Sequence, residues 1–169
     1  MIVVKVGGSL YTRQLLGPAL RRWLSGQNTT VLLVPGGGVF ADAVRILQPV
    51  HALNDATCHR LALHALATAR WLLQELVGST HQVADCWELF GSDQSLPHSW
   101  AITSDTLALL LTQRLHAEKL VLLKSLTIPA GTSWQQASAC GWVDDEFPRT
   151  LEKHPVPVEA INFLELIHP

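Results

Sequence analysis

The fold is decided by the stretch IVVKVGGSL at residues 2–10. Four β-branched residues surround Lys5, a pattern typical of a buried β-strand, and the chain then turns at Gly7 and Gly8. Because glycine has no Cβ, backbone N–H groups at such a turn can approach an anion closely. Lys5 adds a positive charge beside them. The stretch therefore predicts a phosphate-binding turn at the end of a buried strand.

A second glycine turn follows one βα unit later, in VPGGGVFAD at residues 34–42. The carboxyl ends of parallel strands meet at one edge of a sheet, so we expect both turns at the same edge. Two anion-binding turns there indicate a substrate with more than one phosphate. Neither turn fits a Walker A loop or the G-x-G-x-x-G fingerprint. The candidate phosphate-binding residues in the two turns are Gly7, Gly8, Ser9, Gly36, Gly37 and Gly38.

The remaining elements alternate between apolar strand patterns and amphipathic helix patterns. Further strands are predicted over 31–34, 82–84, 119–124 and 156–162, and helices over 15–24, 40–47, 55–77 and 106–116, with a terminal helical turn at 163–167. We expect Pro49 to end the second helix, and polar loops to lead up to residues 98 and 143. This order predicts an α/β fold with a mainly parallel central sheet between two helical layers.

Composition limits the classes of protein that the chain can belong to. With 169 residues it forms one domain with a real core, and its net charge of −2 without a basic run argues against a nucleic-acid partner. Since 48% of the residues are apolar and 15% are charged, we expect self-association into a homodimer or a higher homo-oligomer.

The cysteines and the start of the chain bear on location. Cys58, Cys86 and Cys140 are isolated, and Met1 runs directly into a strand, so we expect a cytoplasmic protein without a signal peptide. The apolar-rich stretch 61–77 contains charged and polar residues, which favours a packed helix over a membrane span.

Two lysines and one aspartate are the candidates for catalysis. Lys5 on a buried strand needs an anion nearby, which is either a ligand or a structural aspartate. Asp105 opens a predicted helix, where it either serves the chemistry or favours the helix dipole. Lys124 ends a predicted strand at the ligand-binding edge of the sheet, or else it faces solvent there.

The histidines do not predict a metal site. His59 and His64 are not spaced as an i, i+4 pair of ligands, and no H-E-x-x-H motif is present. His59 either binds substrate beside the pocket or is a half-buried structural side chain. Asp144 and Asp145 either bind Mg²⁺ through water or cap the turn that follows them.

The two glycine turns together resemble the amino acid kinase superfamily, which includes acetylglutamate, aspartate, uridylate and isopentenyl phosphate kinases. A later pair of segments, TSDTLALLL at 103–111 and AEKLVLLKS at 117–125, also looks like part of that family. Within the superfamily the chain resembles the small kinases that act on (5-(aminomethyl)furan-3-yl)methyl phosphate in methanofuran or methylofuran biosynthesis. The segments DATCHRLALHAL at 55–66 and WVDDEF at 142–147 contribute to this resemblance.

The resemblance implies a single carbamate kinase-like domain, shortened at the C-terminus. Residues 1–100 would form the acceptor-binding half and residues 101–169 a reduced nucleotide-binding half. It also implies ATP-dependent phosphorylation of a small phosphate monoester to a diphosphate, with Mg²⁺ on the ATP. In this scheme Asp105 organises Lys5 and Lys124. The residues implied at the nucleotide are Thr103, Ser104 and Ser125.

Two alternatives stay open at the level of sequence. The segment after Lys124 is short for a nucleotide site, so the chain is alternatively a binding or scaffold protein with a kinase fold and reduced catalysis. A kinase that uses another acceptor, such as a carbamate, an acyl amino acid or isopentenyl phosphate, would share the chemistry but not the pocket.

Overall fold

The computed structural model describes residues 1–167 of the chain. In chain order the elements are β1 (Ile2–Val6), a 3-10 helix (Gly8–Leu10), α1 (Leu16–Ser25), β2 (Val31–Pro35), α2 (Gly38–His51), α3 (Asp55–Val77), β3 (Gln82–Val83), α4 (Cys86–Phe90), α5 (Ser104–Arg114), β4 (Leu120–Lys124), α6 (Trp134–Ala139), α7 (Phe147–Lys153), β5 (Val158–Asn162) and α8 (Leu164–Ile167). Within this part of the chain, no helix combines the length and apolarity needed to cross a bilayer.

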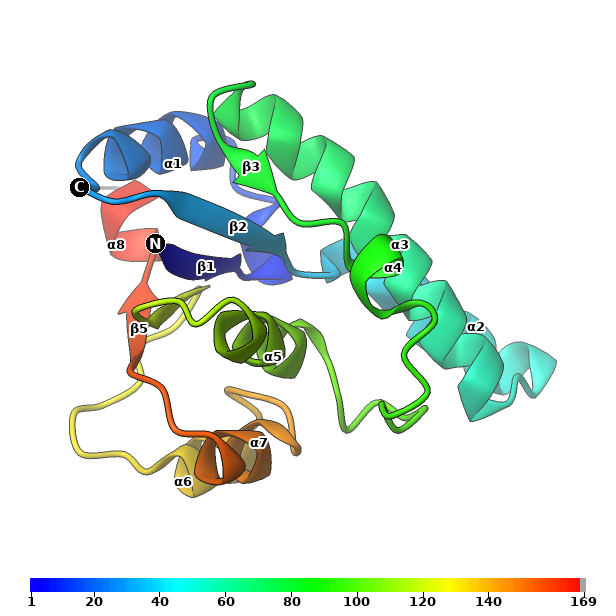
Figure 1. The fold of residues 1–169 in the computed structure, drawn as a ribbon. Coiled ribbons are helices and arrows are strands. Elements are labelled where there is room, and N and C mark those ends of the chain that lie inside the picture. Colours follow the sequence, from blue (N-terminus) through cyan, green and yellow to red (C-terminus); the bar gives the residue numbers. More distant parts are fainter. Residues whose placement is uncertain (168–169) are drawn as a thin grey trace.

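The centre of the molecule is a five-stranded sheet with the order β3-β2-β1-β4-β5 (Figure 1). Every neighbouring pair of strands is parallel, which confirms the predicted α/β class. β1 lies in the middle and β4 beside it, and both are buried at all five positions. Such continuous apolar runs are what a parallel strand covered on both faces requires.

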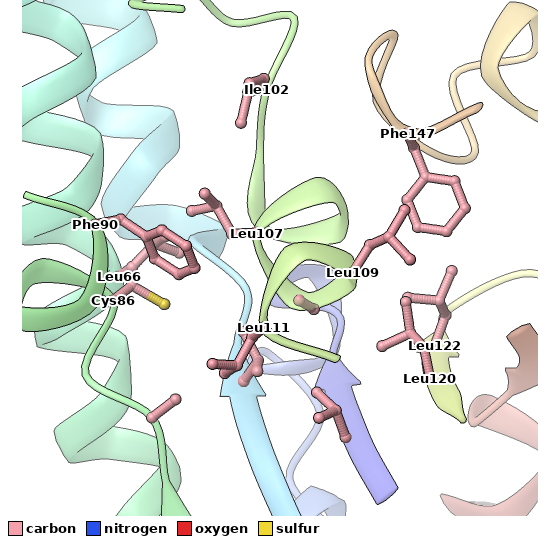
Figure 2. Close-up of a cluster of buried hydrophobic side chains, with 14 of the residues drawn as sticks. Leu66, Cys86, Phe90, Ile102, Leu107, Leu109, Leu111, Leu120, Leu122 and Phe147 are labelled. Atoms are coloured by element: carbon pink, nitrogen blue, oxygen red, sulfur yellow. The ribbon is translucent and has the colours of Figure 1, made fainter. Parts of the chain in front are cut away.

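Helices cover both faces of this sheet, so the predicted three-layer arrangement is confirmed. Val4 and Val6 of β1 face one apolar cluster, to which α1 contributes Leu20. Val3, on the opposite face, belongs to the other cluster, which α5 fills with Leu107. Figure 2 shows part of this second cluster, with side chains from α5, β4 and the start of α7.

The second helix differs from the prediction at its end. α2 continues through Pro49 to His51 and stops at Ala52, which adopts a left-handed conformation (φ 48°). Pro49 lacks the N–H that would bond the carbonyl of Arg45. Because both residues are exposed, solvent can bond that carbonyl instead, and the helix tolerates the proline.

Two short helices lie in segments predicted as loops. α4 begins after Asp85, whose carboxylate accepts hydrogen bonds from the amides of Trp87 and Glu88. α6 begins with a capping box between Ser133 and Gln136. Both signals are present in the sequence, but each helix is too short to show helical periodicity.

The two glycine turns pack directly against each other. A Cβ added to Gly8 would lie 2.1 Å from the amide nitrogen of Gly38, and one added to Gly36 would lie 2.4 Å from the amide nitrogen of Gly8. Gly38 also has a φ of +51°, which side-chain-bearing residues rarely adopt. The glycines are therefore required for the contact between the ends of β1 and β2.

This contact gives a stability prediction. We expect Gly8→Ala to lower the free energy of unfolding by about 3 kcal/mol or more, because the new methyl group meets backbone that cannot move aside. Gly26→Ala is the matched control, since Gly26 has a helical backbone and its Cβ would meet nothing closer than 3.5 Å. Urea denaturation of both variants is the measurement, and equal stabilities would contradict the packing.

Candidate active site

The site is built around one buried carboxylate between two buried ammonium groups. The Oδ1 atom of Asp105 lies 2.9 Å from the Nζ atom of Lys5, and Oδ2 lies 2.7 Å from the Nζ atom of Lys124. All three residues are buried, with at most 8% of their surface exposed. Lys124 donates a hydrogen bond to Asp105, whereas Lys5 forms an ion pair that lacks hydrogen-bond alignment.

The sheet explains why these groups meet. β1 and β4 are neighbours, with Lys5 opposite Leu122, so Lys124 lies two residues further along the adjacent strand. Side chains alternate between faces along a strand, which places both lysines on the same face. α5 packs on that face, and its first turn carries Asp105 to the lysines. The predicted association of the three residues is thus present in the structure.

Electrostatics make this cluster net positive. Burial would raise the pKa of Asp105, but the positive charges of Lys5 and Lys124 outweigh this and hold the pKa below its usual value. Burial, followed by the charge of Lys5, lowers the pKa of Lys124 to about 8 against the opposing effect of Asp105. One carboxylate therefore faces two cations in a poorly hydrated setting, where an added anion is favoured.

A cavity of about 460 Å³ opens beside the cluster. Its volume falls within the usual range for small-molecule sites. It is lined by Lys5 together with residues of both glycine turns. The other lining residues that matter here are Asp42, Arg45, His59, Trp100, Thr103 and Ser104.

Backbone amides at this cavity are available to an anion. Within residues 1–167, the amides of Gly8, Ser9, Gly37 and Gly38 donate to no backbone carbonyl or side chain. α2 and α5 both begin at the cavity, so the positive ends of two helix dipoles converge on it. This is the arrangement expected of a site for phosphate groups.

Gly7 and Gly36 occupy different positions from the other glycines. Their amides donate to the carbonyls of Leu123 and Val6, respectively, both at 2.8 Å. They fix the ends of the strands, while the neighbouring glycines line the cavity.

The predicted nucleotide residues divide between two places. The hydroxyl of Ser125 lies 2.8 Å from that of Ser9, which links the end of β4 to the first glycine turn. Thr103 and Ser104 line the same cavity as His59, at the start of α5. Thr103 is the N-cap residue, but its hydroxyl donates to Asp144 and makes no cap bond to the helix.

His59 lies on α3 at the cavity wall. Its ring stacks on that of His98, with the centroids 4.6 Å apart. Burial, and then the charge of His98, lower the pKa of His59. Within the described residues, no group of three His, Cys, Asp or Glu side chains is placed to hold a metal ion.

The lining of the cavity also includes residues that sequence reasoning missed. The guanidinium of Arg45 lies 4.4 Å from the ring centroid of Trp100 and 2.8 Å from a carboxylate oxygen of Asp42. The indole Nε1 of Trp100 donates to the side-chain oxygen of Gln48 at 2.7 Å. Asp42, Arg45 and Gln48 share one face of α2 by their spacing, but nothing in the sequence pairs them with Trp100.

Two solved kinase structures share this architecture. The chain superposes on a uridylate kinase from Archaeoglobus fulgidus with a TM-score of 0.68 at 16% identity, covering 98% of this chain and 93% of the other. A UMP kinase from Bacillus anthracis gives 0.64 at 10% identity, with 96% and 86% covered.

A curated relative extends the comparison to sequence. The chain is 28% identical, over 189 aligned positions, to a Methanocaldococcus jannaschii protein named [5-(aminomethyl)furan-3-yl]methyl phosphate kinase. The match covers 96% of this chain and 88% of the relative. The chain is therefore similar in sequence to this kinase and shares its fold with the two uridylate kinases. No family model matches the chain.

The buried cluster gives a second stability prediction. We expect Asp105→Asn to lower the free energy of unfolding at pH 7 by about 3–5 kcal/mol, because two buried ammonium groups lose their counter-ion. Glu159→Gln removes the partner of Lys119 in an exposed ion pair and should change it by less than about 1 kcal/mol. Denaturant titration compares the two variants, and similar small effects would show that Asp105 is not holding the lysines.

Proposed function

We propose that the protein is a small-molecule kinase that transfers the γ-phosphoryl group of Mg·ATP to a phosphate monoester and produces a diphosphate and ADP. The observation that carries this is the Lys5–Asp105–Lys124 cluster beside a cavity lined by two glycine turns. Phosphoryl transfer needs positioning and positive charge more than covalent catalysis by the protein. The cluster and the turns offer both.

Each residue has a distinct role in this proposal. Lys5 lines the cavity and pairs with Asp105 at 2.9 Å, so the protons of its ammonium that do not face this carboxylate can donate to phosphate oxygens. Lys124 carries the second charge and is oriented by its hydrogen bond to Asp105. Gly8 and Gly38 bring amides close to the transferred group, where charge that develops during transfer is stabilised.

Mg²⁺ would be held by the phosphates of ATP. Asp105 is occupied by both lysines, and the Asp144 carboxylate accepts hydrogen bonds from the starts of α5 and α7. Neither carboxylate is therefore free to bind a cation. When bound, Mg²⁺ neutralises charge on the phosphates. The protein residues supply the remaining positive charge.

The acceptor that we propose is [5-(aminomethyl)furan-3-yl]methyl phosphate, in the synthesis of a methanofuran-type or methylofuran-type coenzyme. The name of the M. jannaschii relative supports it. The lining of the cavity also matches this acceptor, because Lys5 and the glycine turns suit a phosphate, while Trp100 suits an aromatic ring. Residence in the cytoplasm and homo-oligomer formation stay predictions from the sequence.

Turnover is the direct test. With Mg·ATP and the furan phosphate, we expect the protein to form ADP and the diphosphate, and we expect Lys5→Met and Lys124→Met each to lower kcat about 100-fold or more. Lys119→Met is the matched control, because Lys119 is exposed and pairs with Glu159 far from the cluster. Chromatographic separation of both products gives the rates.

Two outcomes would count against this function. Folded protein and intact substrate without ADP formation would exclude the kinase reaction on this acceptor. Calorimetric binding of the furan phosphate without binding of ATP would favour the alternative of a binding or scaffold protein with reduced catalysis.

The reaction should also depend on pH through Lys124. Its ammonium form stabilises the transferred phosphoryl group, and its pKa in the free protein is about 8, so kcat/KM should fall as the pH rises above about 8. A pH profile of kcat/KM between about pH 6 and pH 10 measures this. A decline centred at pH 10.5, the ordinary pKa of lysine, would mean that the pKa of Lys124 is not lowered or that Lys124 does not take part in the reaction.

A further inference from the structure

A single carboxylate organises the first turn of α5. Asp144, in the segment between α6 and α7, accepts hydrogen bonds from the amides of Thr103 (2.9 Å) and Thr106 (3.0 Å) and from both of their hydroxyls. It also accepts one from the amide of Phe147 at 3.1 Å. Five donors and no donated bond are the pattern of an ionised carboxylate. α5 is thus capped by a residue that follows it by about forty positions in the sequence.

The same contacts connect α7 to α5. Phe147, whose amide bonds to Asp144, packs in the apolar cluster with Leu109 of α5, and Figure 2 shows its ring pointing toward that residue. The amide of Glu146 donates to the carbonyl of Ala101 at 3.1 Å, just before α5 begins. The 144–147 segment therefore holds the start of α5 by both polar and apolar contacts.

Asp105 lies between the two threonines that Asp144 binds. The direction of its side chain toward Lys5 and Lys124 is set by the backbone of that turn. An alternative cap by the hydroxyl of Thr103 is absent, because that hydroxyl donates to Asp144. Small rotations of the turn would displace a carboxylate that must meet two ammonium groups at once.

We propose that Asp144 is a positioning residue for phosphoryl transfer, which holds the first turn of α5 so that Asp105 aligns Lys5 and Lys124. This inference rests on the proposed function. Asp144 acts through Asp105 and does not touch the substrate. The carboxylate lies outside the three-residue cluster but acts on it at longer range: its charge raises the pKa of Lys124, while burial and the charge of Asp105 raise the pKa of Asp144 itself.

A matched pair of cap variants separates positioning from simple helix capping. Asp144→Asn places an N–H donor against the N–H groups of α5, and Asp85→Asn makes the same change at the cap of α4, away from the cavity. Both should lower the melting temperature. We expect only Asp144→Asn to lower kcat, by about tenfold or more, with the KM values for both substrates within about threefold of the parent.

A second readout follows Lys124 directly. The chain has four lysines, at positions 5, 119, 124 and 153, so ¹³C-labelled lysine side chains can be titrated individually by NMR. Removing the negative charge of Asp144 should lower the titration midpoint of Lys124, whereas Asp85→Asn should leave it unchanged. This measurement needs no turnover. If the parent protein makes no ADP, the proposed function fails, and the Lys124 midpoint in Thr106 variants, which keep the charge of Asp144, still decides whether Asp144 positions the turn.

If the Asp144→Asn variant does not fold, substitutions of Thr106 test the same contact with a smaller change. Thr106→Val removes one hydroxyl donor to Asp144 and keeps the shape of a buried side chain, while Thr106→Ser keeps the hydroxyl. We expect the valine variant to lose activity, or to shift the Lys124 midpoint, more than the serine variant does. The proposal is overturned if the Asp144 and Asp85 variants differ in neither kcat nor midpoint. With Asp144→Asn unfolded, it is overturned if the two Thr106 variants are equal in both readouts.

Discussion

The structure depends on one buried carboxylate that holds two buried ammonium groups. Lysines as deeply buried as Lys5 and Lys124 would be strongly unfavourable without Asp105, because desolvation of a charge is not repaid by packing alone. Asp105 neutralises one positive charge and leaves the other. The remaining positive charge lies beside a cavity of about 460 Å³, where it favours the binding of a phosphate group.

The fold brings the rest of the site to this cluster. The sheet is parallel, so β1, β2 and β4 all end at one edge, and the glycine turns after β1 and β2 touch there. The starts of α2 and α5 face the same cavity and add their dipoles to the charge of the lysines. Trp100 and Arg45 add a different character to the cavity, an aromatic ring stacked with a guanidinium.

The sequence predicted the parts of this site that depend on local patterns. An apolar run that contains one lysine and ends in glycines predicts a buried strand followed by a phosphate-binding turn. The apolar run that ends at Lys124 likewise predicts a buried strand whose last residue lies at the ligand-binding edge of the sheet. The sequence was less informative about which side of a helix faces the core and about which distant residues contact each other. On α3, Leu61 is 38% exposed, whereas Leu66 and Leu73 are buried. Apolar residues surround much of that helix, so periodicity alone does not fix which side faces the core.

Sequence patterns also did not predict polar contacts between residues that are far apart in the chain. Capping the turn that follows is one of the two roles that the sequence predicts for Asp144, and the bond from Phe147 provides it, but the bonds of Asp144 to α5 depend on how two distant segments pack. Trp100 is held by Arg45 and Gln48 for the same reason. Such contacts set the geometry of the cavity, and they follow from tertiary packing.

The most direct measurement is a crystal structure of the protein with a non-hydrolysable ATP analogue and the furan phosphate. The account predicts phosphate oxygens within about 3 Å of the Lys5 and Lys124 ammonium groups and of the amides of Gly8 and Gly38, with Asp105 still between the lysines. Phosphates bound at another edge of the sheet, with this cavity empty and its lysines paired only to Asp105, would contradict it.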